Sequence, residues 1–314
     1  MKIKTAQLIK QLIIPDADAN VRFDVSLSKL LPEYSRTQVQ AWIESGEALL
    51  DGQPAKPRTK VRGGEEVTVE ATVKEQPAWE AQPIPLNIVH EDESILIINK
   101  PPGLVVHPGA GNANSTLLNA LLHHAPELQL LPRAGIVHRL DKETSGLLVI
   151  AKTPAALKSL THQIKERSMT REYQCVVYGK FISGGKVDAP IDRHPIHRKR
   201  MAVTDDRGRE ARTGYRVLER LRGATWVEAV LHTGRTHQIR VHFQFLGSPV
   251  VGDATYGKVQ NQRLTQTSGY TAPRQMLHAR KLSFRHPRKA KTLKVEAPLP
   301  ADFQAALTAL RGRA

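Results

Sequence analysis

The chain has 314 residues, of which 40% are hydrophobic, so it can bury a core and disorder of the whole chain is excluded. Lys and Arg number 46 against 30 Asp and Glu, and the resulting net charge of +16 favours a polyanionic partner. No apolar run approaches the roughly 18 residues of a membrane span, the start lacks a signal-peptide pattern, and the single cysteine, Cys175, excludes an internal disulfide and fits a cytoplasmic protein.

The positive charge is concentrated in the C-terminal part of the chain. Residues 1–80 carry 11 basic and 12 acidic side chains, which leaves 35 basic and 18 acidic ones for residues 81–314. A generally basic protein without a nucleic-acid partner would show the same imbalance, so charge by itself does not decide the function.

Residues 22–70 have the pattern of a compact α+β module, preceded by an N-terminal segment of residues 1–21. Asp24 can cap a first helix whose leucines recur at helical spacing, and the capping box that begins at Ser35 opens a second helix. A strand that runs into a tight turn follows, and residues 66–70 alternate like a second strand.

This module resembles the S4 RNA-binding domain. The resemblance rests on Arg22-x-Asp24, Ser35-Arg36, a short helix, Gly46 and Asp51-Gly52. It implies that the second helix and the turn after it lie against structured RNA, which makes Arg36 a candidate RNA-binding residue. Because the module is nearly neutral, we expect it to select the substrate rather than to supply most of the affinity.

Residues 71–86 contain three prolines, which interrupt backbone hydrogen bonding, and are expected to be a linker. Residues 87–314 alternate short strands with amphipathic helices and should form one larger domain with a mostly antiparallel sheet. Strands are expected at Leu147–Ala151, Tyr173–Tyr178 and Thr225–Leu231. A helix should begin at Thr153-Pro154, and the polar residues 259–274 should be a surface insertion.

The segment Gly135–Gly146 carries the candidate chemistry. An apolar strand leads into His138-Arg139-Leu140-Asp141 and then into a turn made of Thr144, Ser145 and Gly146. Such a turn presents the carboxylate of Asp141 at a fixed angle, while Leu140 should pack beneath the loop. An aspartate in a loop often does no more than cap a turn, so the surrounding residues have to decide its role.

The string resembles the active-site loop of the RluA-type pseudouridine synthases, His-Arg-Leu-Asp-x-x-Thr-Ser-Gly. Three further segments are similar to motifs of that family and follow in the same order: Lys100–Gly103, Arg171–Tyr173 and Leu231–His242. With an S4-like module in front, the chain is most similar to the RluD-like branch. The sequence therefore predicts an α+β protein, in which a small S4-type RNA-binding module precedes a catalytic domain of pseudouridine synthase type with a mixed, mostly antiparallel sheet.

Converting uridine to pseudouridine breaks an N-glycosidic bond and joins C5 to C1′, which needs no redox step, metal or cofactor. It needs an ionised carboxylate near the ribose, and the resemblance makes Asp141 this catalytic group. Asp141 can attack covalently or remove the C2′ proton. The resemblance assigns its ion-pair partner to Arg240, and a neighbouring cation lowers a carboxylate pKa by about 1–3 units. Thr236 can cap a helix that carries Arg240; the alternative for Arg240 is a solvated helix charge.

Two more residues have roles that the resemblance implies. Tyr173 would stack on the target base and help to remove the C5 proton, although an ordinary aromatic residue of a sheet has the same spacing. Arg139 would fill the gap that a flipped nucleotide leaves, which suits a planar cation.

Residues 192–216 are rich in arginine and lysine and have little hydrophobic periodicity. We expect a hairpin or loop that grips RNA phosphates, with Arg198, Lys199 and Arg200 as candidate contacts. The alternative is a solvated polar surface.

A zinc site is not expected, because no Cys pair or His-Glu-x-x-His pattern accompanies the histidines. The leading hypothesis is a cytoplasmic, monomeric pseudouridine synthase whose partner is large-subunit (23S) ribosomal RNA or a pre-ribosomal particle, and the resemblance points to the helix 69 stem-loop. The alternatives are the same chemistry on another ribosomal RNA site or transfer RNA, and a non-catalytic RNA-binding factor for ribosome assembly.

Overall fold

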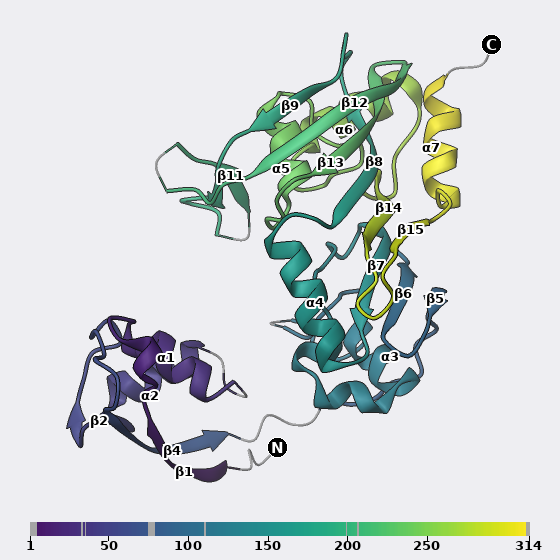
Figure 1. Cartoon of the computed structure of the whole chain (residues 1–314). Coiled ribbons are helices and arrows are strands. Elements are labelled where there is room, and N and C mark those ends of the chain that lie inside the picture. Colours follow the sequence, from purple (N-terminus) through teal and green to yellow (C-terminus); the bar gives the residue numbers. More distant parts are fainter. Residues whose placement is uncertain are drawn as a thin grey trace. The chain divides into compact units, whose positions relative to one another are not determined.

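The computed structural model describes residues 5–32, 34, 36–74, 79–109, 111–198, 200–205 and 207–311. These residues form two compact units, which divide between residues 78 and 79 (Figure 1). Within the described ranges, no helix is both long and apolar enough to cross a membrane.

The small unit is a four-stranded antiparallel sheet packed against two helices. The strand order is β1 (Thr5–Ile13), β4 (Glu66–Lys74), β2 (Ala48–Leu50) and β3 (Gln53–Pro54). A 3-10 turn, η1 (Asp16–Asp18), precedes the helices α1 (Phe23–Leu30) and α2 (Arg36–Ser45). Apolar residues of both helices meet those of β2 and β4 in one core, which includes Phe23, Trp42 and Val67. The predicted α+β module is present.

Two sequence expectations about this unit are corrected. Strand β1 pairs with β4 over its whole length, so residues 5–13 belong to the unit and not to a separate N-terminal segment. Adjacent apolar residues, with Ile9 and Ile13 exposed, hide the two-residue period of β1. Asp24 does not cap α1, which has Arg22 at its N-cap; its buried carboxylate accepts hydrogen bonds from Arg22 and Arg36 instead. Ser35 lies outside the described residues.

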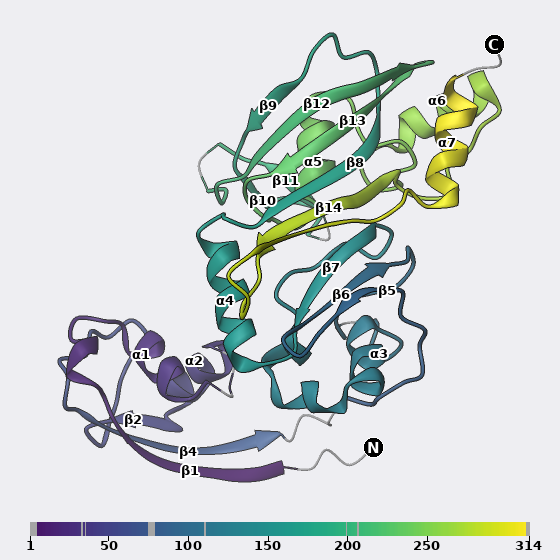
Figure 2. The ribbon, with the colours of Figure 1, turned by 45° about the vertical axis from the view of Figure 1, so that its right-hand side comes forward.

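The large unit is built on a nine-stranded sheet. Its order is β5 (Ile88–Glu91), β6 (Ile95–Lys100), β7 (Ser145–Ala151), β14 (Leu277–Arg285), β8 (Thr170–Tyr178), β13 (Ala224–Leu231), β12 (Arg212–Leu221) and β9 (Gly185–Asp188), and β15 (Thr292–Glu296) also pairs with β14. All these pairs are antiparallel except β7 with β14. Figure 2 shows β14 between β7 and β8. The prediction of a mixed, mostly antiparallel sheet is confirmed.

The helices of this unit are α3 (Leu117–His124), α4 (Pro154–Lys165), α5 (Gln238–Phe245), α6 (Lys258–Ser268) and α7 (Ala301–Arg311), with 3-10 turns η2 (Pro126–Leu130) and η3 (Pro132–Gly135). Helix α4 begins where expected, and the Thr153 side chain accepts a hydrogen bond from the backbone N–H of Ala156. The polar stretch 259–274 is mostly helix α6, whose Leu264 packs into a core with residues of α7.

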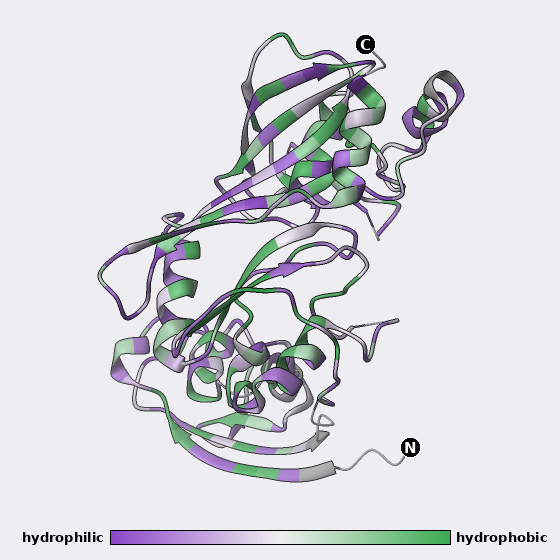
Figure 3. Ribbon diagram, turned by 90° about the vertical axis from the view of Figure 1, so that its right-hand side faces the viewer, coloured by the Kyte–Doolittle hydropathy of each residue, from purple (hydrophilic) through white to green (hydrophobic). Residues whose placement is uncertain are grey.

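Both faces of the sheet are covered, so its central strands are almost continuously apolar. On β6, Leu96 and Ile98 belong to one core cluster together with residues of α3 and α5, while Ile95 and Ile97 belong to a second cluster with residues of α4. Figure 3, coloured by hydropathy, shows that these strands are hydrophobic, whereas the loop that joins β14 to β15 is hydrophilic. Leu140 lies in the first cluster, which fixes the face of the sheet on which Asp141 is found.

Candidate active site

Asp141 lies in the loop that enters β7, where that strand meets β14. The register pairs Ser145 with His278 and Gly146 with Ala279. The backbone N–H of Thr144 donates to the carbonyl of Asp141 at 3.0 Å and closes the turn. Gly146 has a φ of +116°, and a Cβ on it would lie 2.3 Å from the carbonyl oxygen of Ala279, so only glycine fits there.

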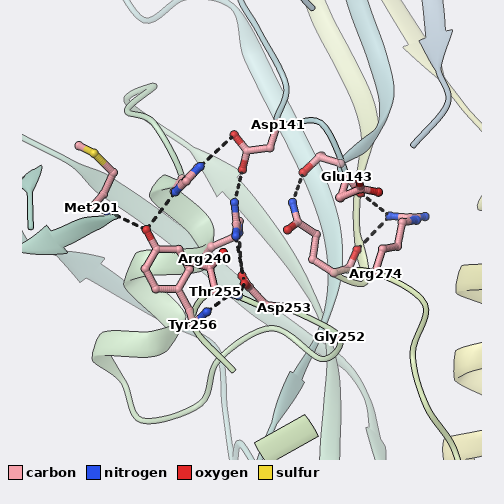
Figure 4. A network of polar contacts seen from close by, with 12 residues as sticks. Asp141, Glu143, Met201, Arg240, Gly252, Asp253, Thr255, Tyr256 and Arg274 are labelled. Carbon is pink, nitrogen blue, oxygen red and sulfur yellow. Dashed lines mark hydrogen bonds and ion pairs between the residues drawn. The ribbon is translucent and has the colours of Figure 1, made fainter. Parts of the chain in front are cut away.

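The ion pair expected between Asp141 and Arg240 is present. Nη1 of Arg240 donates to Oδ2 of Asp141 at 2.9 Å. The other edge of the guanidinium donates to Asp253, from Nε to Oδ2 at 2.7 Å and from Nη2 to Oδ1 at 3.0 Å. Figure 4 shows Arg240 between the two carboxylates. A planar guanidinium can serve both at once, which fixes its orientation.

The three charged groups differ in exposure. The side chain of Asp253 is 0% exposed and that of Arg240 is 6% exposed, whereas the carboxylate of Asp141 is 20% exposed. Burial would lower the pKa of Arg240, but the hydrogen bonds and negative charges of Asp253 and Asp141 outweigh it and raise that pKa. Arg240 therefore remains a cation next to Asp141, and Asp141 alone of the three faces the solvent.

Helix α5 begins differently from the expectation. Thr236 does not cap it; the N-cap is His237, which has a φ of 58° in the left-handed region. The side chain of Gln238 accepts a hydrogen bond from the backbone N–H of Arg235 at 3.0 Å, which holds the turn before the helix. This strained turn brings Nε2 of His237 to 3.9 Å from Oδ1 of Asp141. Burial lowers the pKa of His237, which keeps this ring neutral at pH 7.

Tyr256 connects this site to the arginine-rich hairpin. Its hydroxyl lies 3.0 Å from Nδ1 of His237 and accepts the backbone N–H of Met201 at 2.9 Å. Its ring lies beside the guanidinium of Arg240, at 5.1 Å (Figure 4). The guanidinium of Arg200 lies 5.3 Å from the same ring. Arg200 also donates to the carbonyl of Thr255 at 2.5 Å. The hairpin is thus held against the loop that carries Asp253.

The predicted hairpin is present as β10 (Ile191–Arg193) paired with β11 (Met201–Val203). Arg198 is exposed in the turn between the strands, and Lys199 lies outside the described residues. Arg36 is in the small unit, where it donates to the buried carboxylate of Asp24 with its own side chain 49% exposed.

Two buried basic side chains, those of Arg274 and Lys100, donate hydrogen bonds to backbone carbonyls of the loop that carries Asp141. Arg274 donates to the carbonyl of Glu143 at 3.0 Å (Figure 4). It also forms an ion pair of 2.6 Å with Asp302 of α7. Lys100 donates to the carbonyl of Lys142 at 3.0 Å, and burial lowers the pKa of Lys100 to about 7.

Asp141, Tyr173, Arg139 and Arg240 all line one pocket of about 780 Å³, a size typical of ligand sites. Tyr173 is buried on β8, and burial raises its pKa. Among the described residues that line the pocket, the only carboxylate is that of Asp141. The pocket cations are seven: Arg133, Arg139, Lys165, Arg167, Arg171, Arg235 and Arg240. This excess of cations over carboxylates favours a ligand that carries several negative charges.

The sequence did not reveal Asp253, Tyr256 or Arg274. Asp253 and Tyr256 follow a short apolar run and a glycine, a pattern with no specific meaning, and Arg274 lies at the end of the polar stretch expected to be an insertion. Their roles depend on contacts between distant segments.

Comparison with known proteins gives consistent matches. The family model for RNA pseudouridylate synthase matches residues 94–245, and that for the S4 domain matches residues 21–67. A "Ribosomal large subunit pseudouridine synthase D" from Xanthomonas campestris is 49% identical over 308 residues, which cover 96% of this chain and 93% of the relative. A relative of the same name from Pseudomonas aeruginosa is also 49% identical and covers 92% of each chain.

Solved structures agree. Human RNA Pseudouridylate Synthase Domain Containing 4 has a TM-score of 0.56 and 27% identity, over 72% of this chain and 93% of that one. Human RNA Pseudouridylate Synthase Domain Containing 1 has a TM-score of 0.55 and 29% identity, over 69% and 85%. The predicted family and S4 module are confirmed. With relatives nearly half identical along almost the whole of both chains, the protein belongs to the RNA pseudouridylate synthase family and is an RNA pseudouridine synthase with an S4 domain.

Proposed function

We propose that this enzyme converts uridines of large-subunit ribosomal RNA to pseudouridine, in the helix 69 stem-loop, with Asp141 as the catalytic residue. The observation that carries the proposal is the ion pair of Asp141 and Arg240 in a pocket lined by seven cations and one carboxylate. The names of the relatives from Xanthomonas campestris and Pseudomonas aeruginosa support the choice of RNA. A ribosomal substrate also puts the enzyme in the cytoplasm, where we propose that it acts as a monomer.

The chemistry requires the target uridine to leave its stack, since the carboxylate lies inside a pocket. Oδ2 of Asp141 is held by Arg240, and Oδ1 has no hydrogen bond among the described residues, so Oδ1 is the atom that acts on the ribose. It either attacks C1′ or takes the proton from C2′ as uracil departs. After the base has rotated, C5 bonds to C1′, and Asp141 is released or returns the proton.

The surrounding residues serve this step. The ring of Tyr173 stacks on the uracil and assists loss of the C5 proton, and Arg139, exposed at the pocket, occupies the gap in the RNA stack. Arg198, Lys199 and Arg200 contact phosphates, and Arg36 contributes from the S4 domain. The Arg200–Tyr256 contact gives the hairpin a direct connection to the catalytic residues.

The test uses ribosomal RNA from cells that lack this protein. Pseudouridines are mapped by carbodiimide labelling and reverse-transcription stops, after restoring the wild type, Asp141→Asn or Glu143→Gln. Glu143 is the matched control, because it lies two residues further along the same turn and does not line the pocket. We expect helix 69 stops that return with the wild type and Glu143→Gln but not with Asp141→Asn.

Other outcomes identify the alternatives. Stops that change elsewhere in ribosomal RNA, or only in transfer RNA, would keep the chemistry and replace the substrate. Unchanged maps of both RNAs would contradict the proposal and favour a non-catalytic role in ribosome assembly.

A further inference from the structure

Arg171 is a buried cation that the mechanism above does not use. It lies on β8 two residues before Tyr173, with 7% of its surface exposed, and it lines the pocket of Asp141. Alternate residues of a strand point to the same face, so Arg171 and Tyr173 face the pocket together. Glu172 lies on the opposite face, with its carboxylate 4.0 Å from Nζ of Lys281.

The guanidinium of Arg171 has no hydrogen bond or ion pair among the described residues, and its Nε is buried without an acceptor. The other two buried arginines are fully engaged: Arg240 by Asp141 and Asp253, and Arg274 by Asp302 and several carbonyls. A buried charge without a partner is unfavourable for folding and is retained where it serves another purpose.

Among the residues that the structure describes, the pocket offers no free carboxylate to Arg171. Asp141 is the one carboxylate that lines it, and Asp141 is held by Arg240. Nη1 of Arg171 lies close to Gly234, where a Cβ would approach it to 2.8 Å, so the backbone of this loop packs against the guanidinium. Arg171 thus lacks an anionic partner among the described residues.

We infer that Arg171 binds an RNA phosphate next to the target uridine. The inference rests on the proposed function, because the same pocket receives the RNA. Residues two apart on a strand are separated by roughly 6.6 Å, a spacing comparable to that between a base and the phosphate of its own nucleotide. With the base on Tyr173 and a phosphate on Arg171, the ribose between them is presented to Asp141.

A purely structural role for Arg171 makes a different prediction for stability. If the side chain only packs against Gly234, then Arg171→Met lowers the melting temperature and binding falls with it. If it is a phosphate ligand, Arg171→Met removes an unpaired buried charge, and the melting temperature of the free protein is unchanged or higher.

The direct test is a binding cycle with synthetic helix 69 RNA. The Asp141→Asn protein, which prevents turnover, is compared with the same protein carrying Arg171→Met, Arg171→Lys or the control Arg288→Met. Arg288 is an exposed arginine paired with Glu93 outside the pocket, so the control changes the net charge equally. The dissociation constant is measured over a range of salt concentrations, with a neutral methylphosphonate placed in turn at each phosphate near the target uridine.

We expect Arg171→Met to weaken binding about tenfold or more and to lower the slope of log K against log salt by about 0.7–0.9, with little change for Arg288→Met. A methylphosphonate at one position should weaken RNA binding by the protein that keeps Arg171 but should not change binding by the Arg171→Met protein. Arg171→Lys should restore part of the affinity that Arg171→Met loses. Additive effects at every phosphate, or a lower melting temperature with an unchanged slope, would overturn the inference. Failure of the wild type to modify this RNA would instead contradict the proposed function.

Discussion

Arg240 donates from Nη1 to Oδ2 of Asp141 at 2.9 Å, although the two residues are 99 positions apart in the sequence. The contact joins the loop before β7 to helix α5, and Asp253 fixes the far edge of the same guanidinium. The geometry of the proposed catalytic carboxylate thus depends on Asp253, a buried residue that does not itself line the pocket.

Replacing this guanidinium by an ammonium should separate charge from geometry. Arg240→Lys keeps a cation but cannot donate to Asp141 and Asp253 in the same fork, so we expect kcat to fall about 100-fold or more. Single-turnover pseudouridine formation measures it. Arg216→Lys is the control, because Arg216 is an exposed arginine that pairs with the buried Glu228 and does not line the pocket. Activity of Arg240→Lys within threefold of the wild type would mean that the fork geometry is unimportant.

The hydroxyl of Tyr256 should matter for catalysis beyond its effect on stability. Tyr256→Phe removes the contacts to His237 and the Met201 N–H, so we expect a loss of about 1–3 kcal/mol in the free energy of unfolding and a reduced kcat. Tyr178→Phe is the matched control, because its hydroxyl donates to Asn261 away from the pocket. If both variants lose stability equally and both keep full kcat, Tyr256 has only a structural role.

Glycine is required at the start of β7. Gly146→Ala would place a Cβ within 2.3 Å of the Ala279 carbonyl at a φ of +116°, so we expect a loss of more than about 3 kcal/mol or failure to fold. Gly223→Ala, with a φ of +68° and nothing within 4 Å, should lose only about 1 kcal/mol. Chemical denaturation compares the two, and equal losses would show that the close approach to Ala279 is relieved cheaply.

Much of the fold could be predicted because its signals are local. The strands around Leu147, Tyr173 and Thr225 and the helix after Thr153 each carry a hydrophobic period or a cap within a few residues. Strand β1 could not be predicted, since its Leu-Ile pairs hide the alternation, and its partner β4 lies far along the chain, as in the pairing of Thr5 with Lys74.

The unfolding free energy should depend on pH through His278. This residue is 0% exposed, its Nδ1 lies 2.9 Å from the Ser145 hydroxyl, and burial lowers its pKa to about 4. Between pH 6.5 and 4 the unfolded chain binds a proton that the folded one excludes, so stability present above pH 6.5 is lost as the pH falls, by up to about 3 kcal/mol.

Denaturation at several pH values tests this dependence. The curve for His278→Asn should fall less steeply between pH 6.5 and 4 than that of the wild type, while His123→Asn, at an exposed histidine, should follow the wild type. Identical slopes for His278→Asn and the wild type would refute the assignment.

The candidate site divides in the same way as the fold. Asp141, Tyr173 and Arg240 each lie within a short motif of consecutive residues, and the structure brings all three to one pocket. Asp253 and Tyr256 have no such signal, because a buried ion pair or a shared hydroxyl is a property of two segments and not of either one.

The central claim is that Asp141 performs the isomerisation. Its most direct test incubates purified protein with a synthetic helix 69 stem-loop, and counts pseudouridine by chromatography of the digested nucleosides while RNA binding is measured in parallel. The wild type should convert specific uridines, and Asp141→Asn should bind the RNA but form no pseudouridine. Pseudouridine formation by Asp141→Asn at a rate near that of the wild type would contradict the assignment of this carboxylate.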